Sequence, residues 1–330
     1  MAQLHEASPR ESAPGTPAVI RYPRFTALHH EIARCQALSR SAGEPHCMAL
    51  EGVTGAGKST LVQAFAAAFP QQETEAGTDV PIFYLEMPAP ATVKGVAAAM
   101  LERLGDPLAH HGTLWSMNSR LIKLLIACHV TLVILDDFHH LIDTDTNRVL
   151  VAVSEWLKVL IKETGVPFLV VGIEGQVERV LRANPQLSRL FAIRETLQPL
   201  PPDATFARFV GYAEQVVGLP LVAAWSRPEF LTRLHYATDG VVANLMNLLR
   251  TAALLSQEHQ GSVIDEVALA QAFQQRLAKH LYGKINPFDG RTAEPFAVPM
   301  AAPHDHEPAV GRRSRRRSGA APTVEGAACG

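Results

Sequence analysis

The sequence predicts an α/β fold, in which a parallel sheet flanked by helices is followed by a smaller domain made only of helices. The first observation is that short apolar runs alternate with amphipathic helical patterns over roughly the first 200 residues, which is typical of parallel strands joined by helices. The second is a glycine-rich turn that directly follows one apolar run and precedes a helical pattern. The third is that strand patterns cease from Pro201 onward while helical patterns continue.

The expected strands are short and apolar. They cover residues 46–50, 80–85, 131–135, 167–171 and 193–197, of which the last is the weakest pattern. Helices are expected over residues 58–69, 92–104, 114–127 and 148–163, and in the helical domain over residues 204–217, 228–236, 241–257 and 265–281. Leu200, Pro201 and Pro202 join the two domains.

The ends of the chain differ from its middle. Residues 1–20 are rich in Ala, Pro, Ser and Glu without periodicity, so we expect a disordered lead-in. The sheet domain then spans residues 21–200, the helical domain residues 201–284, and a disordered tail residues 285–330. The positive charge of the tail is concentrated in Arg312, Arg313, Arg315, Arg316 and Arg317. Such a block could hold DNA or an acidic partner, or be a plain soluble extension.

Composition excludes several classes of protein. Of 330 residues, 47% are hydrophobic and 19% charged, which excludes a fibrous chain, disorder throughout and a small disulfide scaffold. The net charge of −2 means that a nucleic-acid partner must be met by a local basic surface. The four cysteines are scattered and encode neither a zinc site nor a disulfide framework. No apolar segment resembles a signal peptide or a membrane span, so we expect a cytoplasmic protein with no membrane partner.

The strongest motif is GVTGAGKS, which fits the phosphate-binding pattern GxxxxGK[ST] and stands after an expected strand and before an expected helix. Backbone N–H groups of the turn and the helix N-terminus would face the phosphates of ATP. Lys58 would reach the β and γ phosphates, and the Ser59 hydroxyl would ligate Mg²⁺. The alternative is a glycine-rich turn that only resembles this motif. The expected nucleotide-binding residues are Gly52, Val53, Thr54, Gly55, Ala56, Gly57, Lys58, Ser59 and Thr60.

Two carboxylates follow the apolar strand LVIL and would lie at the carboxyl edge of the sheet, where nucleotide sites lie in open α/β folds. We expect Asp136 to hold Mg²⁺ through water and Asp137 to act as the general base that polarises the attacking water. The alternative is that the two acids simply end a strand and cap the next helix. His139 and His140 lack a third metal ligand in the sequence, which favours an ordinary polar loop.

The segment NPQLSRLF places an arginine at the end of a short helix, from which it could reach the γ-phosphate bound by a neighbouring subunit. Arg189 is therefore our candidate for an arginine finger. Arg182 or Arg194 could take that role instead, and Arg189 could equally be a solvated helix-terminal residue.

Taken together, these motifs resemble the AAA+ ATPase superfamily, with a nucleotide-binding domain over residues 21–200 and a helical lid over residues 201–284. Longer segments resemble the TniB and TnsC family of transposition regulators. They are RYPR (21–24), YLEMPAPATVKGVAAAMLERLGDP (84–107), LVILDDFHHL (132–141), VPFLVVGIEGQ (166–176), GLPL (218–221) and DGVVANLMNLLRTAA (239–253). The resemblance implies an ATP- and Mg²⁺-dependent protein that polymerises on double-stranded DNA. It also implies that the protein links a TniQ-like target-selection protein to a DDE-type transposase.

Three positions depart from the pattern of that family. Asp137 stands where Glu is usual, and Ile173 stands where a polar residue senses the γ-phosphate. In the expected lid, Ala243 and Asn244 follow the Gly-x-x sequence of residues 240–242, where the family often has Gly-Arg. All three departures lie around the γ-phosphate, so our hypothesis is that ATP binding does most of the work and slow hydrolysis acts as a timer.

By the same resemblance, the segments between the second and third strands face the DNA. Lys94 and Thr113 are the first candidates for contacts to phosphates, followed by Arg103, Arg120 and Lys123. Each could instead be an ordinary solvated helix residue. Trp115 and Trp156 stand at helical spacing from apolar neighbours, which predicts core positions rather than base-stacking platforms.

Two other functions remain open at this stage. The chain could be an ATPase switch or loader that acts mainly on a protein partner, and binding to duplex DNA would separate this function from the first. A small-molecule phosphotransferase is disfavoured, because no residues typical of an acceptor pocket follow the motif and such enzymes do not need a trailing lid with an arginine finger.

Overall fold

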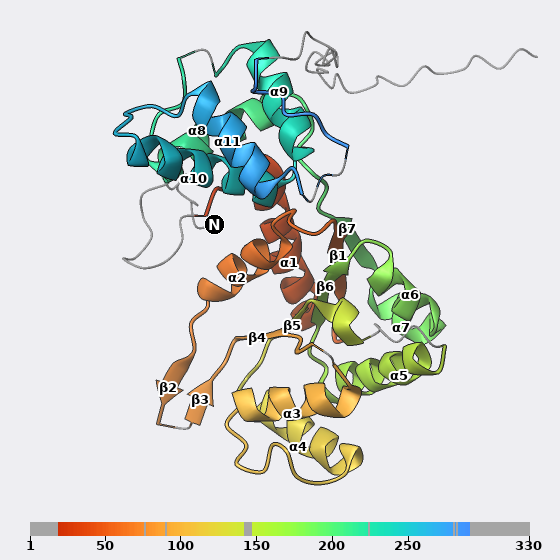
Figure 1. Cartoon of the computed structure of the whole chain (residues 1–330). Helices are drawn as coiled ribbons and strands as arrows, with labels where there is room; N and C mark the ends of the chain where they lie inside the picture. The colour runs from red at the N-terminus through yellow and green to blue at the C-terminus, as the bar shows by residue number, and fades with distance from the viewer. Residues whose placement is uncertain are drawn as a thin grey trace, which may run out of the picture.

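The computed structural model describes residues 19–75, 77–89, 91–141, 147–223, 225–279, 281 and 283–290. A parallel sheet lies at its centre, helices cover both faces of the sheet, and a group of helices lies beyond the carboxyl ends of the strands (Figure 1). Of the predicted disordered lead-in over residues 1–20, residues 1–18 lie outside the described residues, as does the predicted arginine-rich segment from residue 291 onward. Val19 and Ile20, at the end of that lead-in, are half-buried against the core.

The sheet contains the strands that the sequence predicts, with ends displaced by at most two residues. They are β1 (Met48–Gly52), β4 (Ile82–Glu86), β5 (Leu132–Asp136), β6 (Phe168–Ile173) and β7 (Ile193–Thr196). Neighbouring strands are parallel, in the order β4-β5-β6-β1-β7. Because all five run in the same direction, the loops that follow β1, β5 and β6 meet at one edge of the sheet.

Side chains of the strands alternate between two cores, as the pleat requires. In β5, Leu132 and Ile134 pack into the core that contains α1, α2 and the carboxyl-terminal helices. Val133 and Leu135 pack into the core on the other face, beneath α3 to α7. Burial on both faces explains why the strands read as continuous apolar runs in the sequence.

Helices of the sheet domain form the two outer layers. They are α1 (Pro23–Ala42), α2 (Lys58–Ala67), α3 (Val93–Arg103), α4 (Leu114–Ala127), α5 (Asn147–Thr164), α6 (Gln176–Arg182) and α7 (Pro185–Leu190), with the short 3-10 helix η1 (Phe138–Leu141). The sequence analysis did not predict α1. Its signal is nevertheless present, since Pro23 opens the helix and its buried residues recur at helical spacing. Those residues are Phe25, Leu28, Ile32 and Cys35.

The carboxyl-terminal group consists of α8 (Ala204–Val217), α9 (Pro228–Thr238), α10 (Val242–Glu258) and α11 (Glu266–Arg276). The last of these ends five residues before the predicted Leu281. A close backbone contact ties the group to the sheet domain, because the Leu200 N–H donates to the Gly240 carbonyl at 2.9 Å. The predicted tail begins at residue 285, but Asn286 and Phe288 are buried. The packed part of the chain therefore extends beyond residue 284.

A hairpin of two short antiparallel strands, β2 (Gln72–Thr74) and β3 (Gly77–Asp79), lies between α2 and the edge strand β4. It projects away from the sheet in Figure 1. The sequence analysis did not predict this hairpin. Within the described residues, no helix combines the length and the apolar character needed to cross a membrane.

Candidate nucleotide-binding site

The glycine-rich turn connects the end of β1 to the start of α2. Gly57 precedes α2 with φ +101°, a conformation that other residues rarely adopt. Gly52 is required by close packing, because a Cβ there would lie 2.3 Å from the carbonyl oxygen of Leu197. The turn therefore directs the unpaired N–H groups at the start of α2 toward the carboxyl edge of the sheet, an arrangement that attracts anions.

Lys58 is held inside this turn. Its ammonium donates hydrogen bonds to the carbonyl oxygens of Gly52 at 2.8 Å and Val53 at 2.9 Å. Burial lowers the pKa of Lys58, and the nearby carboxylates of Asp136 and Asp137 oppose that shift. The turn thus keeps a cation at the place where phosphate oxygens would be bound.

Asp136 is completely buried at the end of β5. Its Oδ1 accepts from the backbone N–H of Asp137 at 2.9 Å, and its Oδ2 accepts from the Tyr84 hydroxyl at 3.0 Å. The Ser59 side chain is a third hydrogen-bond partner of this carboxylate. Burial raises the pKa of Asp136, and these hydrogen bonds oppose the shift. The sequence-predicted pair of Ser59 and Asp136 is therefore in direct contact.

Asp137 follows at the tip of the strand and has φ +51°, in the left-handed region. Its side chain is partly exposed, and its Oδ1 lies 3.9 Å from Nδ1 of His139. The rings of His139 and His140 lie 4.2 Å apart. Among the described residues, no cluster of three or more His, Cys, Asp or Glu side chains could hold a metal ion. A metal here would depend on Ser59 and Asp136 together with oxygens of a ligand.

These residues border a cavity of about 620 Å³ between the sheet domain and the carboxyl-terminal helices. Its sheet side is lined by Thr54, Gly55, Ala56, Gly57, Lys58, Ser59, Thr60, Asp137, His139, His140 and Ile173. The opposite side is lined by Val19, Ile20, Tyr22, Phe25, Phe209, Val242, Ala243, Met246, Asn247 and Arg250. Volumes of this size accommodate small molecules and cofactors. A cation, helix N–H groups and hard oxygen ligands beside an apolar wall fit a magnesium nucleotide.

The apolar side chains that line the cavity opposite the phosphate turn were not predicted from the sequence. Tyr22 and Phe25 come from the start of α1, while Phe209 and Met246 come from α8 and α10. The start of α1 is fixed over the cavity because Arg24 bonds to Glu195 at 2.7 Å and to the backbone of Thr196. The segment RYPR (21–24) resembles the family in sequence, but neither periodicity nor composition indicates that its tyrosine lines the cavity.

All three departures from the family pattern lie at the cavity, since Asp137 is also one of its lining residues. Ile173 ends β6 and lines the sheet side. Ala243, at the start of α10, lines the opposite side, and its N–H donates to the Gly55 carbonyl at 3.0 Å. Arg250 is the one arginine among the lining residues, and it lies about two helical turns beyond Ala243.

The three arginines considered for the finger role differ in their contacts. Arg182 bonds to Glu178 at 2.9 Å, and Arg194 bonds to both carboxylate oxygens of Glu178 and to the side chain of Ser188. Arg189 is exposed at the end of α7 and bonds to no other described residue. It does not line the cavity of its own chain.

Four of the five predicted DNA contacts lie on exposed positions of α3 and α4. Lys94 and Arg103 lie at opposite ends of α3, Thr113 is the N-cap of α4, and Lys123 lies farther along α4. The fifth, Arg120, requires a correction. It bonds to Asp106, to Ser116 and to the carbonyls of Leu108 and His111, so it organises the loop between the two helices.

The two tryptophans with predicted core positions differ in their burial. Trp156 is buried and donates to Asn118 at 3.1 Å, which confirms its predicted core position. The prediction for Trp115 was wrong, since its side chain is 81% exposed on α4. The buried face of α4 is centred on Met117, Leu121 and Leu125. At 100° per residue, Trp115 points about 120° away from the centre of that face.

A family model described as "Bacterial TniB protein" matches residues 13–198 of this chain. Among curated proteins, none matches it. The structure is similar to that of Cdc6p from Pyrobaculum aerophilum, with a TM-score of 0.58, 14% identity and coverage of 80% of this chain and 69% of the other. The Aeropyrum pernix ORC2 protein in its ADPNP-ADP complexes gives a TM-score of 0.57 at 17% identity, over 80% of this chain and 70% of the other.

The Aeropyrum pernix ORC1 protein, solved in complex with DNA, gives a TM-score of 0.54 at 16% identity, over 79% of this chain and 67% of the other. At these identities the likeness shows the fold. Together with the sheet order and the helical group, it confirms the predicted AAA+ P-loop NTPase fold with a carboxyl-terminal helical lid.

Proposed function

The chain belongs to the TniB family, and from this premise we propose that it is an ATP-dependent, DNA-binding AAA+ regulator of DNA transposition. It oligomerises on duplex target DNA without sequence preference and connects a TniQ-like target-selection protein to a DDE-type transposase. ATP binding drives assembly, and slow hydrolysis limits the lifetime of the assembly.

One observation carries the proposal. The cation of Lys58, the Ser59–Asp136 pair and the carboxylate of Asp137 meet at one edge of the sheet, beside a cavity closed on its far side by the lid. In the bound state Mg²⁺ would neutralise charge on the β and γ phosphates. Ser59 and Asp136 would hold it, and Lys58 would bind the same phosphates.

The site supports assembly because, apart from Lys58, the chain places little positive charge of its own around a γ-phosphate. Ile173 and Ala243 occupy two positions from which a polar or cationic side chain could reach it. Arg189 is exposed at the end of α7 and lies outside the cavity. A head-to-tail neighbour would supply this arginine, and repetition of that contact builds a filament or an open ring.

Slow turnover follows from the reach of Asp137. A general base must lie within hydrogen-bonding distance of the attacking water. The aspartate carboxylate is one methylene shorter than the glutamate that the family usually has. Its partly exposed side chain leaves the water less firmly oriented, so ATP persists long enough for partners to join.

The DNA surface is built from side chains that are free to meet phosphates. Lys94, Arg103 and Lys123 meet this requirement, whereas Arg120 is committed to its loop. The Thr113 hydroxyl accepts from the Ser116 N–H as the cap of α4 and still has its hydrogen to donate to a phosphate. Contacts from lysine, arginine and hydroxyl groups bind the backbone without reading sequence. Their affinity falls steeply with salt, and repetition along a filament compensates for weak binding by each subunit.

Negative-stain imaging with duplex DNA tests the proposal directly. We expect ordered decoration with a non-hydrolysable ATP analogue and bare DNA with ADP. Lys94→Ala should reduce decoration and its salt dependence, while Lys162→Ala, which removes an exposed lysine from α5, should have no effect. Bare DNA in every sample, with nucleotide bound, contradicts DNA-directed assembly.

A second function, a switch acting on a protein partner, is favoured by one observation. The helical hairpin of α3 and α4 exposes large apolar side chains, namely Leu108, Trp115 and Ile126. Trp115 also provides the means to decide. Its fluorescence should change when duplex DNA binds this face, and Trp115→Phe should abolish that change. An unchanged signal with DNA favours the protein partner.

A further inference from the structure

The orientation of Asp136 depends on a strand that belongs to neither the phosphate turn nor the pair of acids. Its Oδ1 is fixed by the N–H of the next residue along the chain. A carboxylate held at one oxygen can still rotate about its Cβ–Cγ bond. The second hold comes from Tyr84, whose hydroxyl donates to Oδ2 at 3.0 Å.

Tyr84 reaches Asp136 from β4, the edge strand of the sheet. The backbone register pairs Tyr84 with Ile134 and Glu86 with Asp136, so the tyrosine starts two residues behind the carboxylate, and its ring must span about 7 Å along the strand. Side chains of β4 alternate, and Tyr84 lies on the face that α2 covers. Phenylalanine would fill the same volume, so core packing does not require the hydroxyl.

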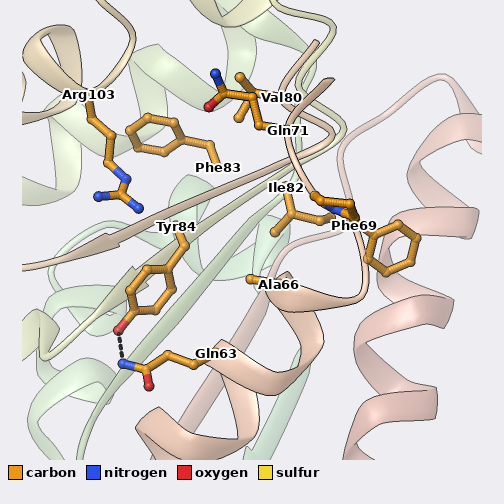
Figure 2. Close-up of a pocket in the computed structure, with 10 residues that line it drawn as sticks. Gln63, Ala66, Phe69, Gln71, Val80, Ile82, Phe83, Tyr84 and Arg103 are labelled. Carbon is orange, nitrogen blue, oxygen red and sulfur yellow. Dashed lines mark hydrogen bonds between the residues drawn. The ribbon is translucent and has the colours of Figure 1, made fainter. Parts of the chain in front are cut away.

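Gln63 holds the tyrosine from the other side. Its Nε2 donates to the Tyr84 hydroxyl oxygen at 2.9 Å, which leaves the hydroxyl hydrogen for Asp136. Figure 2 shows this bond in a second cavity, of about 230 Å³, between α2 and β4. Gln63 lies one helical turn after Ser59 on α2, so a single helix presents both the metal-binding hydroxyl and the amide that holds Tyr84.

We propose that Tyr84 is a positioning residue that fixes the Asp136 carboxylate for Mg²⁺, and that Gln63 fixes Tyr84. If a cation is bound, the Ser59 hydroxyl would direct a lone pair to the cation and could still donate its hydrogen to Asp136. Tyr84 and the Asp137 N–H donate to the same carboxylate from outside this metal-binding pair, and they keep it aligned. This inference rests on the proposed function, because it concerns the magnesium nucleotide of the same site.

The test measures nucleotide binding as a function of Mg²⁺ concentration, with a fluorescent ATP analogue. For Tyr84→Phe we expect affinity without Mg²⁺ to stay within about twofold of wild type. The Mg²⁺ concentration at half-maximal enhancement should rise about 3- to 10-fold, since a hydrogen bond to a charged group is lost. Tyr212→Phe, which alters an exposed tyrosine of α8, is the matched control and should behave as wild type.

Gln63→Leu provides an independent arm, because this side chain is exposed and its loss does not disturb the core. The Mg²⁺ concentration at half-maximal enhancement should rise about 2- to 3-fold in this variant. In the double variant it should rise no further than in Tyr84→Phe alone, since both residues act through one chain of hydrogen bonds. If the Mg²⁺ concentration at half-maximal enhancement is unchanged in both single variants, the proposal is overturned. If wild type itself binds nucleotide with no dependence on Mg²⁺, the proposed function of the site fails instead.

Discussion

The two sides of the nucleotide cavity are built from different chemistry. On the sheet side, Lys58, Ser59 and Asp136 are charged or polar, and each hydrogen-bonds to its neighbours. On the lid side, the wall is mainly apolar, with Phe209 and Met246 among its residues. Phosphates and a metal belong against the first surface, and the base with its sugar belongs against the second. The sheet side should therefore distinguish ATP from ADP, whereas the lid side should bind both equally.

The largest effect is expected at Lys58. Lys58→Ala removes the cation from the phosphate site and leaves the carbonyls of the turn facing the ligand. Turnover should fall more than about 1,000-fold, because electrostatic stabilisation of the phosphates is lost. Assembly on DNA should be abolished as well. The measurements are ATP hydrolysis and imaging of DNA with the non-hydrolysable analogue. If this variant coats DNA as wild type does with no nucleotide present, ATP does not join the subunits.

A smaller effect, confined to turnover, is expected at Arg189. Arg189→Ala should reduce DNA-stimulated hydrolysis about 1,000-fold, the lower end of the effect of an arginine supplied by a neighbour. ATP affinity should stay within about twofold, because the residue lies outside its own cavity. Arg182→Ala serves as the matched control, since that arginine is bonded to Glu178.

Mixing the inactive variants sharpens this test. An interface between the nucleotide site of Arg189→Ala and the arginine of Lys58→Ala contains every group that hydrolysis needs. The mixture should recover part of the activity that neither variant shows alone. No recovery, with both proteins assembled, would indicate that Arg189 acts within its own chain or not at all.

At Asp137, a substitution is expected to raise the rate of ATP hydrolysis rather than lower it. Asp137→Glu lengthens the side chain by one methylene, which brings the carboxylate closer to the attacking water, and turnover should rise about 3- to 10-fold. Asp137→Asn should abolish hydrolysis while the analogue still supports assembly. Single-turnover hydrolysis separates the chemical step from product release. If Asp137→Glu hydrolyses ATP more slowly than wild type, the short side chain of Asp137 is not the cause of slow turnover.

The sheet side could be predicted from the sequence because its chemistry is contiguous. Eight adjacent residues form the phosphate turn, and two adjacent acids end an apolar strand, so local pattern alone indicates the site. The lid side brings together Tyr22, Phe209 and Met246, which lie far apart in the chain and carry no local signature. Only the tertiary fold makes them neighbours.

The missed elements have separate causes. Pro23 opens α1, and the apolar spacing that follows could have predicted the helix. The core position predicted for Trp115 was wrong because its apolar neighbours at helical spacing lie on a different side of α4 from the buried face. The contact between Tyr84 and Asp136 could not be predicted, since it depends on strand register, which the sequence of one strand does not specify.

The smallest change in nucleotide binding is expected from substitution of Arg250, on the lid side of the cavity. This residue shares a face of α10 with Ala243, which contacts the phosphate turn, but lies about 10 Å farther along the helix axis. Its cation is therefore placed for the base or the sugar rather than for the γ-phosphate. Arg250→Ala should weaken ATP and ADP binding alike, by about 2- to 5-fold, with turnover at saturating ATP unchanged.

Arg227→Ala, at an exposed position outside the cavity, is the control for the loss of charge from the lid. Calorimetry with both nucleotides provides the measurement, and the ratio of the two affinities is the quantity that matters. If the ratio of ATP affinity to ADP affinity stays constant, the lid side does not distinguish the two nucleotides, as proposed. A selective loss of ATP affinity would show that Arg250 reaches the γ-phosphate within its own subunit. The lid would then compensate for the missing arginine at Ala243, and the case for a neighbour's Arg189 would weaken with it.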